Sequence, residues 1–200
     1  MKVLAILAHP SKGSFNLAIA QTALSVLRKN GHEVYYHDLY EEDFNPVLPG
    51  SEIPEGGLND PVIARHCEEA AEADAFLIVH PNWWGQPPAI LKGWVDRVFR
   101  VGVGYCYQEE DDGSGVPMGL LKAKLALVFN TSDTLPERES EVFGDPLETL
   151  WKNCIFHFCG VPEFHRKTFS VVVTSTQDHR HRWLQEVEET VGSLFPRHRQ

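Results

Sequence analysis

The run Val3–Ala8 constrains the fold of this chain most, because six apolar residues follow one another without alternating with polar ones. Such a run is typical of a strand buried on both faces, as in a parallel sheet covered by helices. Pro10 blocks continuation of the strand ladder. Apolar residues then recur at helical spacing between positions 17 and 27. The sequence therefore opens with a predicted strand, a polar loop and a helix.

The loop between these two elements has the composition of an anion-binding turn. Gly13 permits a tight backbone path, and Ser14 and Asn16 supply a hydroxyl and an amide. The start of a helix also presents free N–H groups and the positive end of its dipole to a phosphate. The same composition is typical of a plain helix N-cap, so the loop alone leaves ligand binding and simple capping as alternatives.

Strand and helix patterns alternate along the rest of the chain. Strands are expected over residues 32–38, 75–80, 124–129 and 169–173, and helices over residues 60–74, 89–99, 147–158 and 180–194. Residues 39–60, rich in proline and glycine, are expected to form a long irregular excursion. This alternation predicts an α/β fold with a doubly wound parallel sheet. We expect one domain over residues 1–196 and a frayed tail over residues 197–200.

Composition narrows the class of protein. A net charge of −10 and a pI near 5.4 argue against a nucleic-acid or anionic-membrane partner. The four cysteines form no CxxC pair, so free thiols in a reducing compartment are expected. No apolar run reaches membrane-spanning length, and the first residues do not resemble a secretion signal. The histidines lack metal-ligand spacing. We therefore expect a cytoplasmic protein without membrane insertion or a metal site.

Three polar loops follow the expected first, third and fourth strands, and in a doubly wound sheet such loops meet where the strand order reverses. They are residues 11–16, the stretch 81–88 with Trp83 and Trp84, and residues 130–134. Together they suggest a phosphate cradle beside an aromatic, amide-rich wall, which suits a planar ring such as a flavin. Simpler alternatives are a Trp pair in the core and a structural His9 bonded to a backbone carbonyl.

Three motifs give the chain a family resemblance that covers most of its length. They are Ala8-His9-Pro10 with Ser14-Phe15-Asn16, then Asp38-Leu39-Tyr40 leading to Phe44-Asn45-Pro46, and finally the stretch Pro81–Val98. In combination they resemble the NAD(P)H:quinone oxidoreductases of the flavodoxin-like fold. The resemblance implies a three-layer α/β/α domain with a five-stranded parallel sheet of order 2-1-3-4-5. It also implies a homodimer with a shared active site.

The resemblance also implies the residues of a flavin site. Those expected at the pyrophosphate and ribityl chain are His9, Ser14, Phe15 and Asn16. Those expected along the isoalloxazine are Pro81, Asn82, Trp83 and Trp84. Those expected to close its other side are Asn130, Thr131, Ser132 and Asp133. Tyr105 and Tyr107 match tyrosines of the family's quinone and nicotinamide pocket, where they would come from the partner subunit.

The third loop departs from the mammalian pattern, which has a Gly-Gly pair and then a Tyr and a His that relay protons. Here Ser132-Asp133 is followed by Glu137 and Phe143. The relay is therefore not carried over, and the second proton is expected from Tyr105, Tyr107 or water.

The implied activity is two-electron hydride transfer from NAD(P)H through the flavin to a quinone-like acceptor. The Ser-Phe-Asn resemblance favours FAD, with FMN as the alternative, and the choice between NADH and NADPH stays open. Two rival functions are a regulatory flavin-binding subunit of a membrane transporter with incidental reductase activity and a one-electron carrier of the flavodoxin type.

Overall fold

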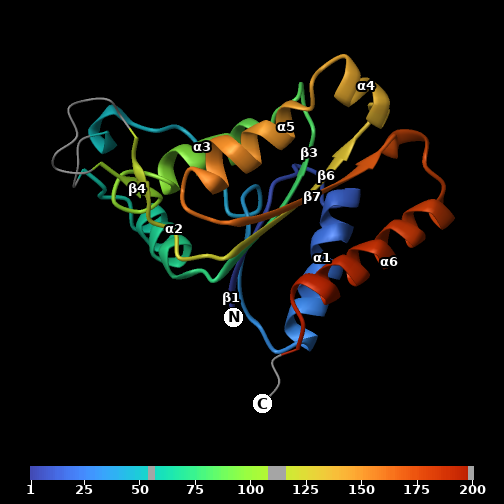
Figure 1. Ribbon diagram of the computed structural model, residues 1–200, viewed down its shortest axis with the longest axis horizontal. Helices are drawn as coiled ribbons and strands as arrows, with labels where there is room; N and C mark the ends of the chain where they lie inside the picture. The colour runs from blue at the N-terminus through green and yellow to red at the C-terminus, as the bar shows by residue number, and fades with distance from the viewer. Residues whose placement is uncertain (54–56, 108–115, 198–200) are drawn as a thin grey trace.

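A five-stranded parallel sheet forms the centre of the computed structural model, which describes residues 1–53, 57–107 and 116–197 (Figure 1). Its strands, in spatial order, are β2 (Glu33–Asp38), β1 (Lys2–Leu7), β3 (Ala75–Pro81), β6 (Leu125–Ser132) and β7 (Glu163–Ser170). In sheet terms this is the order 2-1-3-4-5, which confirms the predicted fold class. The order reverses between β1 and β3, because β1 connects outward to β2 while β3 leads to the opposite edge.

Helices cover both faces of the sheet (Figure 1). The helices α1 (Phe15–Lys29) and α6 (Gln177–Leu194) pack on one face. The other face carries α2 (Pro61–Glu72), α3 (Ala89–Val98) and the continuous segment α5 (Pro146–Glu148) and η2 (Thr149–His157). The smaller elements are η1 (Gly50–Glu52), α4 (Pro136–Glu141), η3 (Val172–Thr174) and the hairpin β4 (Tyr105–Cys106) and β5 (Met118–Gly119).

Alternate residues of each central strand feed two separate cores. Val3, Ala5 and Leu7 of β1 point into the core under α1 and α6, whereas Leu4 and Ile6 point into the core under α2 and α3. Every residue of β3 and β6 is buried. Burial on both faces explains why these strands have no polar alternation in the sequence. No helix in the described ranges is long and apolar enough to cross a membrane.

Several predicted boundaries differ from the structure. The last strand is β7, and the prediction of residues 169–173 was wrong because this edge strand is half exposed and mostly polar, while Val171 adopts a left-handed conformation (φ 61°) that ends it. β6 runs on to Ser132, so the first residues of the predicted third loop are strand. The predicted helix 147–158 is mostly π-helical.

Two expected segments lie largely outside the described residues. Residues 108–119 are acidic and contain glycine, which predicts a loop, and the structure describes this segment only from residue 116 onward. The predicted frayed tail is described only at residue 197.

Candidate active site

A cavity of about 830 Å³ opens where the carboxyl ends of β1, β3 and β6 meet, at the reversal of strand order. Eleven of the twelve residues predicted to bind flavin line it, namely His9, Ser14, Phe15, Asn16, Pro81, Asn82, Trp83, Trp84, Thr131, Ser132 and Asp133. The three loops picked out in the sequence thus lie around one hollow. Its size is ordinary for a cofactor site.

The N-terminus of α1 forms the first wall. The Ser14 hydroxyl accepts a hydrogen bond from the backbone N–H of Leu17 at 3.1 Å and so caps the helix. Asn16 donates from Nδ2 to Thr131 Oγ1 at 2.9 Å, which ties α1 to the end of β6. The Asn16 Oδ1 atom is buried and has no partner within the described chain. An unused acceptor beside the free N–H groups of a helix start fits a ligand that carries both an anion and a hydrogen-bond donor.

The second wall is a tight turn that presents two indoles to the cavity. Trp83 and Gln86 exchange two backbone hydrogen bonds of 3.0 Å each, and the Asn82 side chain accepts another from the Gly85 N–H. Trp84 adopts φ 58°, a conformation that non-glycine residues rarely take. As a result Trp83 is 41% exposed and Trp84 fully exposed. These rings do not belong to the core, so the core alternative for the Trp pair is wrong.

The rest of the lining consists of residues that were not among the predicted flavin contacts. They are Gly85, Thr134, Glu139, Phe143, Pro146, Val172 and Val173. Glu139 and Phe143 come from α4 and the turn after it, where the acidic run 137–141 gives no sign of a binding wall. Glu139 accepts a hydrogen bond from Asn82 Nδ2 at 3.0 Å, which joins α4 to the Trp-bearing turn.

Asn130 is the one predicted flavin residue that does not line the cavity. It is fully buried in β6, where its Oδ1 accepts hydrogen bonds from Arg166 and Thr168. Arg166 also binds the carboxylates of Asp145 and Glu148. Asn130 therefore belongs to a network that fixes the segment before Pro146, a residue of the cavity wall. Sequence adjacency to Thr131 could not distinguish these two positions, since alternate strand residues face opposite sides.

Two histidines at the strand ends are held neutral in different ways. His9 accepts a hydrogen bond at Nδ1 from the Ser11 N–H at 3.0 Å, and burial lowers its pKa. The structural alternative predicted that His9 bonds to a backbone carbonyl. In the structure its Nδ1 instead accepts from a backbone N–H. Burial lowers the pKa of His80 to about 4, while its Nδ1 pairs with the Pro81 carbonyl and its Nε2 accepts from the Trp151 indole. His80 thereby supports the strand end that carries Pro81.

Tyr105 and Tyr107 lie apart from this cavity. Tyr105 borders a second hollow of about 430 Å³ between α3 and η2, and its ring packs against Phe158 and Tyr107 with centroids 5.2 and 5.8 Å away. Tyr107 is about half exposed. Within a single chain, therefore, the structure does not bring the two predicted catalytic residues to the cavity.

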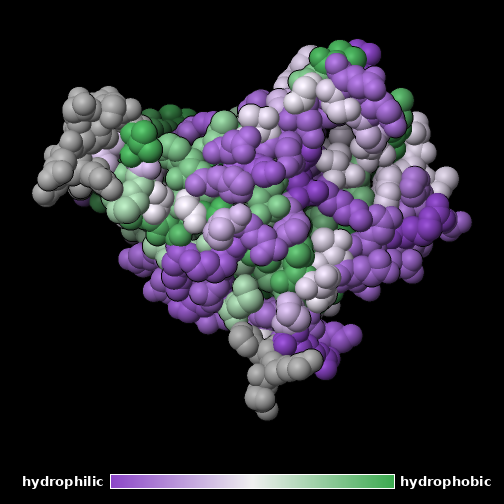
Figure 2. All heavy atoms as spheres, viewed as in Figure 1, coloured by the Kyte–Doolittle hydropathy of each residue, from purple (hydrophilic) through white to green (hydrophobic). Residues whose placement is uncertain are grey.

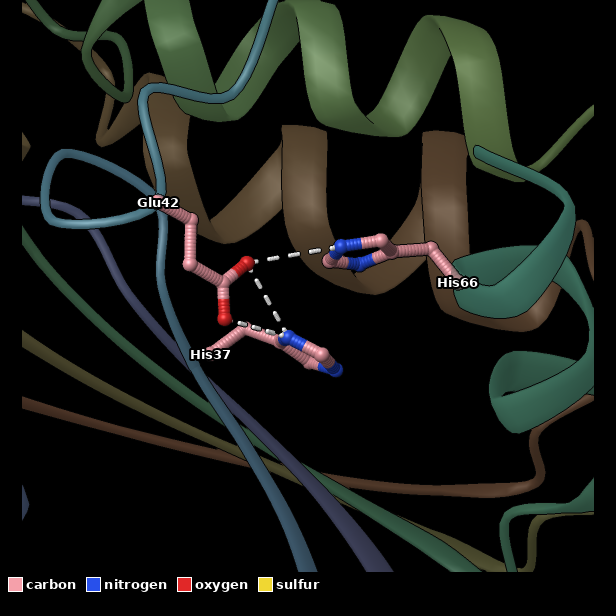
Figure 3. A group of neighbouring side chains, drawn as sticks. All are labelled: His37, Glu42 and His66. Atoms are coloured by element: carbon pink, nitrogen blue, oxygen red, sulfur yellow. Dashed lines mark hydrogen bonds and ion pairs between the residues drawn. The ribbon is translucent and has the colours of Figure 1, made fainter. Parts of the chain in front are cut away.

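A separate cluster of two buried histidines and the exposed Glu42 has the composition of a metal site (Figure 3). His37 Nδ1 lies 2.8 Å from Glu42, and His66 Nε2 lies 3.5 Å from the same carboxylate. However, the Trp94 indole donates to His66 Nδ1 at 3.0 Å. Indole N–H is only a donor, so the proton of neutral His66 sits on Nε2 and faces Glu42. His66 therefore offers that carboxylate a proton and has no lone pair for a metal.

Comparisons with known proteins place this geometry in context. Residues 1–191 match the family described as Flavodoxin-like fold. An uncharacterized NAD(P)H oxidoreductase of Haemophilus influenzae is 35% identical over 173 residues, which cover 84% of this chain and 83% of that protein. NAD(P)H dehydrogenase (quinone) 1 of Cavia porcellus is 33% identical over 80% of this chain, which spans 64% of that enzyme. An NAD(P)H:quinone oxidoreductase from Methanothermobacter marburgensis shares the fold, with a TM-score of 0.84, 24% identity and coverage of 100% and 99% of the two chains.

Proposed function

We propose that this chain, which belongs to the NAD(P)H:quinone oxidoreductase family of the flavodoxin-like fold, is a flavin-dependent reductase that passes a hydride from NAD(P)H to a quinone-like acceptor. The observation that carries the proposal is the cavity at the strand-order reversal, where a helix N-terminus faces two exposed indoles. Residues 1–196 would form the single flavin-binding domain. We further propose a cytoplasmic location, which the four free cysteines support.

The residues at the cavity fit a flavin by their chemistry. The phosphate end would meet the N–H groups at the start of α1, with Ser14 and Asn16 beside them. The exposed rings of Trp83 and Trp84 offer a wall for the isoalloxazine, and Thr131 and Ser132 close the other side. We propose FAD on the resemblance of Ser14-Phe15-Asn16 to the family's motif, and FMN is the alternative because both flavins share the phosphate end that this wall would hold. The bound flavin would supply the hydride chemistry, and the protein would position donor and acceptor in turn.

Tyr105 and Tyr107 support a homodimer in which they complete the cavity of the second copy. Tyr105 belongs to β4 and Tyr107 follows it directly, and Figure 2 shows apolar (green) atoms exposed on the left of the molecule, where Figure 1 labels β4. The exposed apolar residues beside Tyr105 are Leu48, Ile53, Val101 and Phe158, which line the same hollow, and Met118 of the paired strand β5. Burial of such residues is a driving force for association.

An anaerobic titration tests the proposed activity. Protein reconstituted separately with FAD and FMN is reduced with NADH or NADPH while the flavin absorbance is recorded, and 1,4-benzoquinone is then added. We expect reduction in a single two-electron step and full reoxidation by the quinone. A flavoprotein that neither nucleotide reduces, or that benzoquinone does not reoxidise, would refute the reductase proposal while leaving flavin binding intact.

A further inference from the structure

The charged side chains in the described lining of the cavity are all acidic. Of the side chains that line it, Asp133 and Glu139 are carboxylates, and none is lysine or arginine within the described residues. His9, the remaining titratable group in the lining, has a lowered pKa because of burial and is neutral near pH 7. The chain as a whole carries a net charge of −10. The part of the cavity that Asp133 and Glu139 line therefore presents negative charge to a small molecule, whereas the start of α1 presents the N–H groups that would meet the phosphate.

Glu139 is the better anchored of the two carboxylates. Its Oε1 accepts from Asn82 Nδ2, and Asn82 is itself held by a backbone bond to the Thr131 carbonyl at 2.6 Å and by the Gly85 N–H. The other Glu139 oxygen has no hydrogen bond to any described residue. The side chain is half-buried among the apolar lining that includes Phe143. Partial burial keeps solvent from screening the charge fully.

Asp133 differs from Glu139 in its exposure to solvent. It lies at the rim, where its Oδ1 accepts from the Val173 N–H at 2.8 Å. Water screens an exposed carboxylate strongly, so it contributes less to the potential inside the cavity. Of the two carboxylates, Glu139 is therefore the one whose charge water screens less. Two arginines outside the lining lie over lining rings, Arg138 over Phe143 at 5.3 Å and Arg180 over Phe15 at 5.9 Å, measured to the ring centroids.

We infer that Glu139 makes the reductase select its acceptors by charge, favouring neutral and cationic aromatic acceptors over anionic ones. The inference rests on the proposed function and adds the substrate class. A sulfonate or carboxylate on the acceptor is repelled by Glu139, and no lysine or arginine of the described cavity lining compensates. A cationic substituent is attracted by the same carboxylate.

Helix α4 offers a matched control for this residue. Glu137 and Glu139 belong to the same short helix and carry the same charge, but Glu137 is exposed and does not line the cavity. Glu139→Gln keeps an oxygen that accepts from Asn82 and removes the charge, so the wall can keep its geometry. Glu137→Gln changes the net charge equally without touching the cavity.

The test compares kcat/KM for three naphthoquinones in 0.15 M salt: the neutral 2-methyl compound, the 2-sulfonate, and one bearing a trimethylammonium group. For each charged quinone, kcat/KM is divided by the value for the neutral compound, and this ratio is compared between wild type and variant. The intrinsic reactivity of the quinones then cancels. In Glu139→Gln we expect the anionic ratio to rise roughly fivefold and the cationic ratio to fall by a similar factor, as a partly screened charge contact predicts. Glu137→Gln should shift either ratio by less than about twofold.

A binding measurement provides a second readout that requires no turnover. The oxidised flavoprotein is titrated with naphthalene-2-sulfonate, and the dissociation constant is read from the perturbed flavin absorbance. We expect Glu139→Gln to bind it several-fold more tightly than wild type. Two results would overturn the inference alone, provided that the neutral quinone is reduced. One is that the kcat/KM ratios in Glu139→Gln equal those of wild type, and the other is that Glu137→Gln changes these ratios as much as Glu139→Gln does. Failure of wild type to reduce the neutral quinone would overturn both this inference and the proposed function.

Discussion

At the scale of single residues, His37 is a buried ring held between two carboxylates. Its Nδ1 contacts Glu42, and its Nε2 contacts Glu69 of α2 at 2.5 Å. Burial alone would lower the pKa of His37, but the hydrogen bonds to these carboxylates outweigh it and raise the pKa. Burial would likewise raise the pKa of Glu42, yet the hydrogen bond with His37 and the nearby His66 ring lower it to about 2. The cluster therefore favours the charged form of His37, whereas burial lowers the pKa of the neighbouring His66.

This arrangement makes stability depend on pH through His37. The pKa of His37 is higher in the folded protein than in the unfolded chain. Its contribution to the free energy of unfolding is therefore fully present below the unfolded-state pKa of about 6.5, and it is lost as the pH rises through the pKa of the folded state. A neutral ring can donate to only one of its two carboxylates. We expect the free energy of unfolding to fall by about 1–2 kcal/mol across this window.

Urea unfolding of wild type and His37→Gln between pH 6 and pH 9 measures this contribution. The decrease in the free energy of unfolding with rising pH should be absent in His37→Gln. It should be retained in His165→Gln, which alters an exposed histidine paired with Glu163. A further charged group beside the cluster is Arg65, whose Nε lies 3.9 Å from Glu69. If His37→Gln kept the wild-type pH slope, the charged His37 would not be its source.

Trp84 is a residue at which stability and function should oppose each other. Its left-handed backbone strains any side chain, and its ring is fully exposed. We expect Trp84→Gly to raise the free energy of unfolding by about 0.5–1 kcal/mol, because glycine adopts this conformation without strain. The same variant should bind flavin more weakly. Trp84→Ala, which loses the ring and keeps the strain, should weaken flavin binding without the gain in stability.

The two effects are read from urea unfolding and from flavin titration. Unchanged flavin affinity in both variants would remove Trp84 from the proposed wall.

At the scale of elements, the contact between α3 and the excursion after β2 depends on Gly93. A Cβ built at Gly93 would lie 2.2 Å from the Pro46 carbonyl oxygen and 2.4 Å from its Cβ. Because Pro46 meets Gly93 partly through rigid backbone, we expect Gly93→Ala to reduce the free energy of unfolding by about 2–3 kcal/mol. The matched control is Gly192→Ala in α6, where a Cβ meets nothing within 4 Å.

In a helix with open space, alanine is expected to stabilise by about 0.5–1 kcal/mol relative to glycine. Thermal or urea unfolding of both variants measures the difference. Equal effects at the two positions would mean that the close approach of Pro46 does not constrain the fold.

The elements also show where sequence reasoning succeeds. The central strands have continuous apolar runs because both their faces are buried, and these runs predicted the sheet and the meeting of three loops. Edge strand β7 lacks that signal, since Glu163 and most of its neighbours are at least partly exposed. Glu139 was not predicted because its role depends on the path of α4 over the cavity, and the acidic pattern of that helix indicates only a solvated surface. Asn130 was misplaced because strand alternation turns it away from the cavity.

At the scale of the whole molecule, the separation of Tyr105 from the cavity leads to a prediction about mixed dimers. If each cavity is completed by a tyrosine of the other copy, Tyr105→Leu chains and Asn16→Leu chains fail in different parts of the site. Each homodimer should then have low activity. Random mixing after dissociation should restore about a quarter of wild-type activity, because half of the dimers contain one intact site out of two.

Activity of the refolded mixture and its sedimentation measure this directly. A monomer in sedimentation, or a mixture no more active than its components, would contradict the shared site.

The most direct test of the central claim is a titration of flavin-free protein with FAD and with FMN, followed by the fluorescence of flavin and tryptophan. We predict one flavin per chain, quenched by the exposed indoles, with weaker binding in Asn16→Leu and unchanged binding in Glu137→Gln. Absence of saturable binding for both flavins, or binding that Asn16→Leu does not weaken, would contradict the assignment of the cavity as the flavin site.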